Sequence, residues 1–430
     1  MEFRIESRSI ALFGLAIFAT LLAGCSNFST TTTASIAPVT TPDVVLSVPT
    51  DGTLVSGAST LVSGTCTTDA GSVTISGTAI QADVVTTCTS DLFSSTVTLV
   101  ASEGTRTITT SQSTAAGTTT KTISVTRNCA LNFVLIPADG VLGTPAVCIA
   151  KYEMKAKTNA GVAVFDGNNG GVPLDETLHI PESRPDGIPW VRITQPNAIL
   201  ECATMGAGYH LVTAKEWSAM IRNVAARGTN WDSGTAGTGK MFSGHSDGVL
   251  SATAVADGFG AAGTSLLSAG TGTDAYVGTG NASTDLFGSG KEQRRTFDLS
   301  NGEKIWDISG NARDTNDADG LGNTLSYTGP GSSGLNDVFS AAVTAFLPTI
   351  ALSGGGTFDA NWIQPATAGL DNATNAIGRF YLSSGARAGR ILTRGGNFSP
   401  GNSPGVFAAD FDSDTASQSS TGAFRCAKNF

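Results

Sequence analysis

The sequence predicts a mostly β protein of the α+β kind, with few helices and many loops. Glycine occurs 52 times among 430 residues, and only 14% of the residues are charged. Short runs of β-branched residues alternate with Ser, Thr and Gly, whereas helical periodicity is rare. This pattern is typical of β-rich extracellular proteins. A chain of this length suggests about two or three domains.

The net charge of the chain limits its partners. The formal charge is −10, and no basic stripe occurs in the sequence. Proteins that bind nucleic acid need such a stripe to neutralise phosphates, so no nucleic-acid partner is expected. The acidic residues would serve solubility, and some of them could hold metal ions.

The first 24 residues have the features of a signal peptide. Arg4 and Arg8 precede an apolar run from Ile10 to Leu22, and the run ends in Leu-Ala-Gly followed by Cys25. This ending resembles the bacterial lipoprotein cleavage box, which implies that Cys25 carries a lipid anchor. With Ser26 next, the usual sorting rule favours the outer membrane, with the protein exposed at the cell surface. The alternative is an ordinary secretory signal with an incidental cysteine.

Residues 25–41 are rich in Ser and Thr and predict a flexible tether. Residues 42–127 then contain short strand candidates separated by turns, a pattern typical of an immunoglobulin-like β-sandwich. Cys66 and Cys88 lie on or beside these strands and could form a disulfide in an oxidising compartment. The segment resembles the Ig-like spacer modules of bacterial surface proteins. The candidates are Val44–Val48, Thr60–Val62, Ser72–Ile75, Ser95–Val100, Thr107–Ile108 and Thr122–Val125.

Residues 128–430 begin with a predicted hairpin and later contain a helix with a clear start. Phe133–Pro137 and Val147–Met154 are the hairpin strands, and Cys129 and Cys148 could pair beside them. Thr213 with Glu216 three residues later forms a capping box, which predicts an amphipathic helix from this point to Val224.

Four blocks in this region resemble the formylglycine-generating enzymes, also called sulfatase-modifying factors. They are Leu211–Trp217, Ile305–Asp314, Arg394–Gly396 and Gly422–Cys426, in the order of that family. Val212 replaces the usual proline. The resemblance implies a C-type-lectin-like fold with two helices and long loops. It also implies a disulfide between Cys202 and Cys426, the alternative being two free buried thiols.

The resemblance implies a Ca²⁺ site but not the oxidase activity. The block with Asp307, Gly310, Ala312 and Asp314 would supply oxygen ligands to Ca²⁺, although Asp314 replaces a longer Glu. The alternative is that these acids are solvated loop residues. The run 397–423 contains no cysteine, and the three histidines form no metal motif, so neither copper nor iron is expected. We therefore expect no enzyme.

Segment 394–426 resembles the variable proteins of diversity-generating retroelements. Gly405-Val406-Phe407-Ala408 and Phe424-Arg425-Cys426 match their fixed framework, with Phe398 in place of Trp. The resemblance implies that loops 397–404 and 410–421 bind a cell-surface protein or a glycan. A formylglycine-type oxidase and a purely structural envelope lipoprotein are the alternatives. The implied ligand-binding positions are Ser399, Pro400, Asn402, Ser403, Asp410, Asp412, Ser413 and Ser417.

Overall fold

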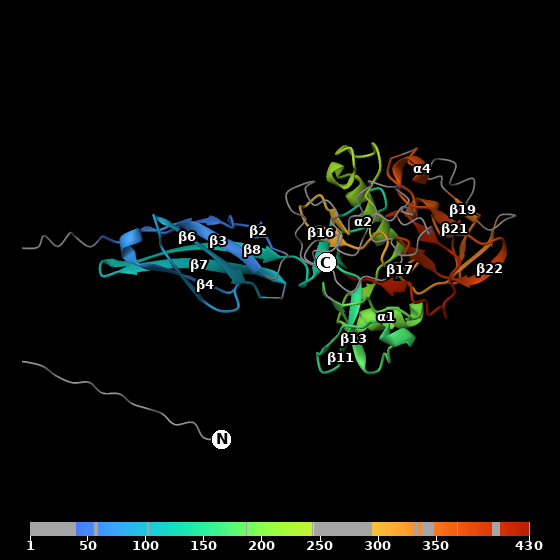
Figure 1. Ribbon diagram of the computed structural model, residues 1–430, viewed down its shortest axis with the longest axis horizontal. Coiled ribbons are helices and arrows are strands. Elements are labelled where there is room, and N and C mark those ends of the chain that lie inside the picture. Colours follow the sequence, from blue (N-terminus) through green and yellow to red (C-terminus); the bar gives the residue numbers. More distant parts are fainter. Residues whose placement is uncertain are drawn as a thin grey trace, which may run out of the picture. The chain divides into compact units, whose positions relative to one another are not determined.

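Strands dominate the computed structural model, which confirms the prediction of a mostly β protein (Figure 1). Two helices longer than one turn occur among the described residues, α1 (Gln195–Thr204) and α2 (Ala214–Ala225). Shorter helical turns lie at Thr68–Ala70, Asn169–Gly171, Gly228–Asn230, Ala360–Trp362 and α4 (Asn372–Asn375). The structure describes residues 40–55, 59–100, 103–185, 187–242, 244, 295–329, 334–336, 348–367, 369–397 and 405–429.

Among the described residues, the first eight strands pair with one another in two sheets. One sheet has the order β1-β3-β6 and the other the order β2-β8-β7-β4-β5. Apolar side chains from both sheets, such as Val62 and Phe93 from one and Ile75 and Ile108 from the other, share a buried core. This is the predicted β-sandwich. The strands are β1 (Val45–Val48), β2 (Thr53–Leu54), β3 (Ser59–Thr65), β4 (Ser72–Ser76), β5 (Val84–Thr87), β6 (Leu92–Thr98), β7 (Gly104–Thr114) and β8 (Gly117–Arg127).

Two details of the sandwich differ from the sequence prediction. Strands β2 and β5 were not predicted, because both are short and at least half of each faces solvent, which leaves little apolar alternation. The predicted strands at Thr107–Ile108 and Thr122–Val125 are parts of a long hairpin, β7–β8, paired in unbroken register from Gly104 to Arg127.

A four-stranded sheet joins the beginning and the end of the region that follows. Its order is β14-β26-β10-β9, with bounds Tyr209–Leu211, Cys426–Asn429, Val147–Ala150 and Phe133–Ile136. The β9–β10 pair is the predicted hairpin. The C-terminal strand β26 pairs with both β10 and β14. The last residues of the chain therefore close a sheet begun almost 300 residues earlier.

A six-stranded sheet carries the C-terminal segment that the sequence singles out. Its order is β19-β21-β24-β23-β17-β25, a mixture of parallel and antiparallel pairs. The strands are β17 (Arg313–Asn316), β19 (Gly334–Asn336), β21 (Phe380–Leu382), β23 (Leu392–Arg394), β24 (Ala409–Asp410) and β25 (Gly422–Phe424). Smaller sheets contain β11 (Met154–Thr158), β12 (Ala163–Val164), β13 (His179–Ser183), β15 (Thr296–Asp298), β16 (Lys304–Trp306), β18 (Leu325–Gly329), β20 (Ala351–Leu352) and β22 (Gly385–Arg390).

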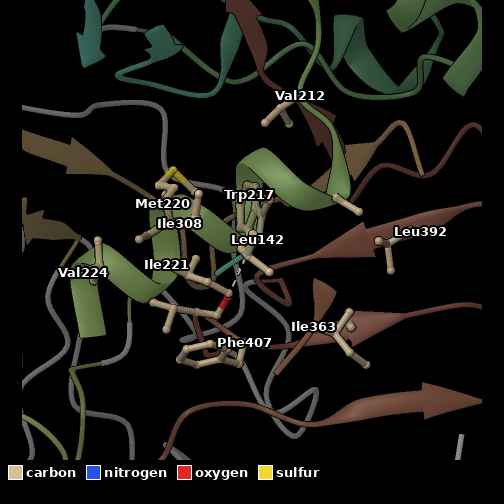
Figure 2. Packing of buried hydrophobic residues seen from close by; sticks show 14 of the residues in the cluster. Leu142, Val212, Trp217, Met220, Ile221, Val224, Ile308, Ile363, Leu392 and Phe407 are labelled. Carbon is tan, nitrogen blue, oxygen red and sulfur yellow. Dashed lines mark hydrogen bonds between the residues drawn. The ribbon is translucent and has the colours of Figure 1, made fainter. Parts of the chain in front are cut away.

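Helix α2 begins as the sequence predicts and forms the centre of the larger core. The Thr213 hydroxyl accepts from the Glu216 backbone N–H, and the Glu216 carboxylate accepts from the Thr213 N–H. The buried face of the helix includes Trp217 and Ile221, which lie in one cluster with Phe407 (Figure 2). The Trp217 indole N–H donates to the carbonyl of Val406 over 3.3 Å. Helix α2 thus anchors the chain just before β24.

Gly405 allows the close approach that sets the position of this strand. A Cβ at Gly405 would lie 2.2 Å from the backbone nitrogen of Gly378 and 2.3 Å from the carbonyl carbon of Ile377. No side chain fits at such distances, so this position requires glycine.

The structure was searched for helices that could cross a membrane. Within the described part of the chain, no helix is both long and apolar enough to cross a bilayer. The predicted signal peptide and Cys25 lie outside the described residues.

Candidate functional site

A pocket of about 280 Å³ lies on the six-stranded sheet. Its lining comes from four strands of this sheet, from the residue before β21 and from the turn that follows β23. Two guanidinium groups, a phenol, a hydroxyl, an amide and a carboxylate contribute to it. The lining residues are Arg313, Arg379, Tyr381, Thr393, Gly396, Asn397, Ala409 and Asp410.

The pleat of the sheet explains how these side chains come together. Asp410 on β24 pairs with Tyr381 on one neighbouring strand and with Thr393 on the other. Alternate side chains point to opposite faces of a sheet, so these three share one face. The adjacent residues Phe380, Leu392 and Phe411 belong instead to the buried core on the other side. One face thus packs against the core, and the other carries the pocket.

Asp410 is the predicted ligand position that lines this pocket. Its Oδ2 accepts from Arg313 Nη1 over 2.7 Å, and its Oδ1 accepts from the backbone N–H of Asp412 over 2.8 Å. Burial raises the pKa of Asp410, although the Arg313 charge opposes this shift. The carboxylate is therefore oriented by two donors at the pocket wall.

The other described ligand positions, Asp412, Ser413 and Ser417, are not in the wall of this pocket. The Oδ1 of Asp412 lies 3.5 Å from Arg387 Nε and 4.0 Å from Arg390 Nε. The Ser413 carbonyl accepts from the N–H of Ile391. Ser417 is half-buried, and its N–H donates to the carbonyl of Asp414. The predicted positions Ser399, Pro400, Asn402 and Ser403 lie outside the described residues.

Buried Arg394 fixes the chain at the start of the first predicted loop. Its Nε donates to the carbonyl of Ala408 over 3.0 Å, and its Nη1 donates to the carbonyl of Trp362 over 3.1 Å. Burial lowers the pKa of Arg394 to about 9, so the group stays cationic at neutral pH. Because Arg394 holds Ala408, it ties the residues before the loop at 397–404 to the residues after it.

The predicted Ca²⁺ ligands are engaged by arginines instead. Arg295 Nε and Nη2 each donate to one carboxylate oxygen of Asp307 over 2.6 Å. Arg425 Nε donates to Asp314 Oδ2 over 3.0 Å. All four side chains are almost fully buried. Each guanidinium group thus forms an ion pair with a carboxylate that Ca²⁺ would need as a ligand.

The backbone near these aspartates is also committed to protein contacts. The N–H of Ala312 donates to Glu153 Oε1 over 2.9 Å, and the N–H of Gly310 donates to the carbonyl of Gly395 over 2.9 Å. No group of three His, Cys, Asp or Glu side chains among the described residues could hold a metal ion. The present arrangement does not fit Ca²⁺, and calcium stays a prediction from the resemblance.

Six buried charges form one cluster around these ion pairs. Burial raises the pKa of Glu153 to about 8 and that of Asp314 to about 6, while burial lowers the pKa of Lys155 to about 8. Burial also acts to raise the pKa of Asp307, but the charge and hydrogen bonds of Arg295 outweigh it, so that pKa is lowered. With Arg295 and Arg425, the cluster holds three potential anions and three potential cations, so ionic partners inside the protein can balance every charge.

All three predicted cysteine pairs are disulfides. Cys66 is bonded to Cys88, Cys129 to Cys148, and Cys202 to Cys426. The third bond joins α1 to β26 across 224 residues. Of the seven cysteines in the sequence, only Cys25 is outside these bonds.

The sequence did not identify most of the pocket wall. Arg379, Tyr381 and Thr393 stand in or beside short strands without a motif, and Arg313 lies in the block Ile305–Asp314 but was not assigned a binding role. The alternation Phe380-Tyr381-Leu382, apolar on either side of a polar ring, was the one available signal. Asn397 does belong to the predicted loop 397–404.

Comparisons with known proteins add little. No protein-family model matches the chain. No curated protein matches it either. Among solved structures, the crystal structure of an engineered protein at 1.98 Å resolution is 29% identical over 20% of this chain, with a TM-score of 0.18. The chain spans about a fifth of the length of that protein.

Proposed function

We propose that this protein is a lipid-anchored surface protein whose C-terminal domain, of the C-type-lectin-like kind found in formylglycine-generating enzymes, binds a ligand. The pocket on the six-stranded sheet is the observation that carries the proposal. It is concave, built on paired strands and lined by several polar side chains, and its wall includes Asp410 and Asn397 from the two loops for which the sequence predicts binding. Pockets with convergent polar groups are the default location of ligand sites.

The cysteines favour binding over oxidation. A formylglycine-type oxidase needs thiolates to hold copper, and six of the seven cysteines are already in disulfides. The remaining one, Cys25, is the proposed lipid attachment site. The candidate partner is a cell-surface protein or a glycan, presented to a protein that Cys25 anchors at the outer membrane.

The test is a binding screen with the full-length protein in detergent micelles, on arrays of glycans and bacterial surface proteins. For any ligand found, Tyr381→Ala should weaken binding at least about tenfold, because the ring forms part of the pocket wall. The matched surface variant Asp83→Ala should bind like the wild type. Equal binding by Tyr381→Ala would place the interaction elsewhere and contradict the proposal.

Stability measurements separate the pocket residues from the buried core beneath the sheet. Phe407 is fully buried, so Phe407→Ala should cost roughly 3–5 kcal/mol of stability. The pocket variant Tyr381→Ala should cost much less, since that side chain is half-buried. If Tyr381→Ala unfolds the protein while Phe407→Ala leaves it folded, Tyr381 is a core residue and not a pocket residue, and the assignment is wrong.

The proposal of diversification has its own test. If loops 397–404 and 410–421 are rewritten by a retroelement, the downstream DNA should contain a near-copy of the segment that encodes residues 394–426. The copy should differ at adenines and lie beside a reverse transcriptase gene. Without both features, the domain is a binding module with a fixed sequence.

A further inference from the structure

Arg313 and Asp410 form an ion pair in the wall of the pocket. Arg313 Nη1 donates to Asp410 Oδ2 over 2.7 Å. The pleat of the sheet places both side chains on the pocket face: Asp410 pairs with Thr393, Thr393 pairs with Thr315, and Arg313 precedes Thr315 by two residues. The wall therefore presents a cation and an anion side by side.

Both members of this pair keep hydrogen-bonding capacity beyond the contact between them. A carboxylate has about four acceptor sites, and Asp410 uses two of them, for Arg313 and for the N–H of Asp412. A guanidinium group has several N–H donors, and within the described part of the chain the Arg313 side chain donates to Asp410 alone. The two side chains are 23% and 27% exposed. The pair thus offers a ligand both donor and acceptor sites.

The ring of Tyr381 lies next to the ion pair. Tyr381 on β21 is the direct partner of Asp410 on β24, so the two side chains stand on the same face of neighbouring strands. The Tyr381 side chain is half-buried and lines the pocket. Its ring provides a flat apolar surface. The wall therefore combines an apolar surface with an ion pair beside it.

This combination favours a sugar over a side chain of a protein partner. A basic side chain would compete with Arg313 for Asp410, and an acidic one would compete with Asp410 for Arg313. An apolar anchor would leave the donor and acceptor sites of the pair without partners, which weakens binding. A hydroxyl group both donates and accepts hydrogen bonds. Two neighbouring sugar hydroxyls can therefore bond to the pair without displacing either charge.

We propose that the pocket binds a sugar through two vicinal hydroxyl groups, of which one donates to Asp410 and the other accepts from Arg313. The two oxygens of a gauche vicinal diol are separated by about the length of a hydrogen bond, which matches the contact between Arg313 and Asp410. The C–H face of the sugar packs on the ring of Tyr381. These contacts use side chains alone and need no metal ion. This inference rests on the proposed binding function and specifies its ligand class.

The test measures binding of oligosaccharides to the full-length protein in detergent micelles by isothermal titration calorimetry, in buffer that contains EDTA. The probes are neutral oligosaccharides that end in glucose, galactose, mannose, N-acetylglucosamine or rhamnose, and at least one of them should bind. Deoxy analogues of that probe then remove one hydroxyl of the terminal sugar at a time. Loss of either member of one vicinal pair should weaken binding at least about tenfold, and loss of any other hydroxyl should weaken it much less. This comparison uses the wild-type protein and needs no variant to fold.

Variants then locate the site. Asp410→Asn should weaken binding of the sugar at least about tenfold, because the amide offers one acceptor oxygen in place of two and no charge to orient Arg313. Arg313→Gln should weaken it to a similar extent. Since the two residues act as a pair, the double variant should lose less affinity than the two single losses combined. The exposed controls Asp83→Asn and Arg227→Gln should bind like the wild type.

The outcomes distinguish the ligand class from the binding function. The sugar proposal is overturned if no neutral probe binds, if binding requires Ca²⁺ and is absent in EDTA, or if no vicinal pair of hydroxyls matters more than the others. The proposed binding function survives each of these results when the array screen yields a ligand whose binding requires Tyr381. If no ligand in either experiment depends on the pocket residues, both proposals fail.

Discussion

Arg425 and Asp314 form an ion pair inside the protein, with Arg425 Nε 3.0 Å from Asp314 Oδ2 and both side chains almost fully buried. Arg425 also donates to the carbonyls of Ala150, Lys151, Trp306 and Asp307. The arginine thereby holds the end of the chain to β17 and to the turns after β10 and β16. Asp314 follows Arg313 on β17, so the same strand contributes to the buried frame and to the pocket.

Asp314→Asn should therefore be strongly destabilising. It leaves Arg425 buried with less compensating charge, and breaking one side of a buried ion pair typically costs about 3–5 kcal/mol. Urea unfolding followed by tryptophan fluorescence measures this part of the chain, because all five tryptophans lie beyond residue 128. The exposed control Asp83→Asn should change stability by no more than about 0.5 kcal/mol. A loss of similar size in both variants would show that the pair contributes little.

Chelation should leave the melting temperature unchanged. Arg295 and Arg425 already neutralise Asp307 and Asp314, so EDTA should remove no stabilising ion from this block. A resident Ca²⁺ at 100 times its Kd would instead contribute about 2.7 kcal/mol of stability. Differential scanning calorimetry with EDTA, and then with excess Ca²⁺, separates the two cases. A melting temperature that falls with EDTA and recovers with Ca²⁺ would restore the calcium prediction.

Loss of the Cys202–Cys426 disulfide should cost more than loss of Cys129–Cys148. Removing a native disulfide typically costs about 2–5 kcal/mol, and the chain-entropy model scales the cost with loop length. The sequence separations are 224 and 19 residues, so the model predicts a difference of about 2 kcal/mol. Paired Cys→Ser variants compared by urea unfolding test this order. Equal losses of stability would mean that the longer loop does not lower the conformational entropy of the unfolded chain more than the shorter one.

The His210–Glu216 pair should give a pH-dependent contribution to stability. Burial lowers the pKa of His210, but the hydrogen bond and charge of Glu216 outweigh it, and the net pKa is raised above 6.5. Burial raises the pKa of Glu216, and its bonds to His210 and Thr213 reverse this to a net lowering below 4.5. The histidine contribution is complete below pH 6.5 and is lost as pH rises through its folded pKa. The glutamate contribution is complete above pH 4.5 and is lost as pH falls through its folded pKa.

His210→Gln should thus cost most between about pH 4.5 and 6.5. A partly exposed pair of this kind is worth about 1 kcal/mol or less. The difference between wild type and variant, measured by urea unfolding across pH 4 to 9, should shrink at the alkaline end, where the imidazole is neutral. A difference that is constant with pH would assign the effect to packing alone.

Cys25→Ala should release the protein from membranes. If Cys25 carries the lipid, its loss removes the anchor, whereas the wild type should enter the detergent-rich phase in a Triton X-114 partition. Metabolic labelling with a palmitate analogue provides the direct readout. Retention of Cys25→Ala in the detergent-rich phase would contradict the lipid-anchor hypothesis.

The features that the sequence determined depend on local interactions or on single strong constraints. Thr213 and Glu216 start α2 because their side chains and backbone groups satisfy one another within one turn. Gly405 belongs to the framework that the resemblance implies, and in the structure no side chain fits there beside Gly378. The period-two runs predicted a mostly β chain, and the cysteine pairs were correctly anticipated.

The tertiary structure alone decided the pocket and the partners of the buried acids. Arg313, Tyr381, Thr393 and Asp410 come from four strands whose order in the sheet is not their order in the chain. Asp314 forms an ion pair with Arg425, 111 residues later in the chain, and no local sequence pattern predicts such a pair. Strand pairing over such distances depends on how whole faces pack. The sequence therefore predicted the loops that contain Asn397 and Asp410. The order of the strands and the packing of the core bring Arg313, Tyr381 and Thr393 to the same pocket.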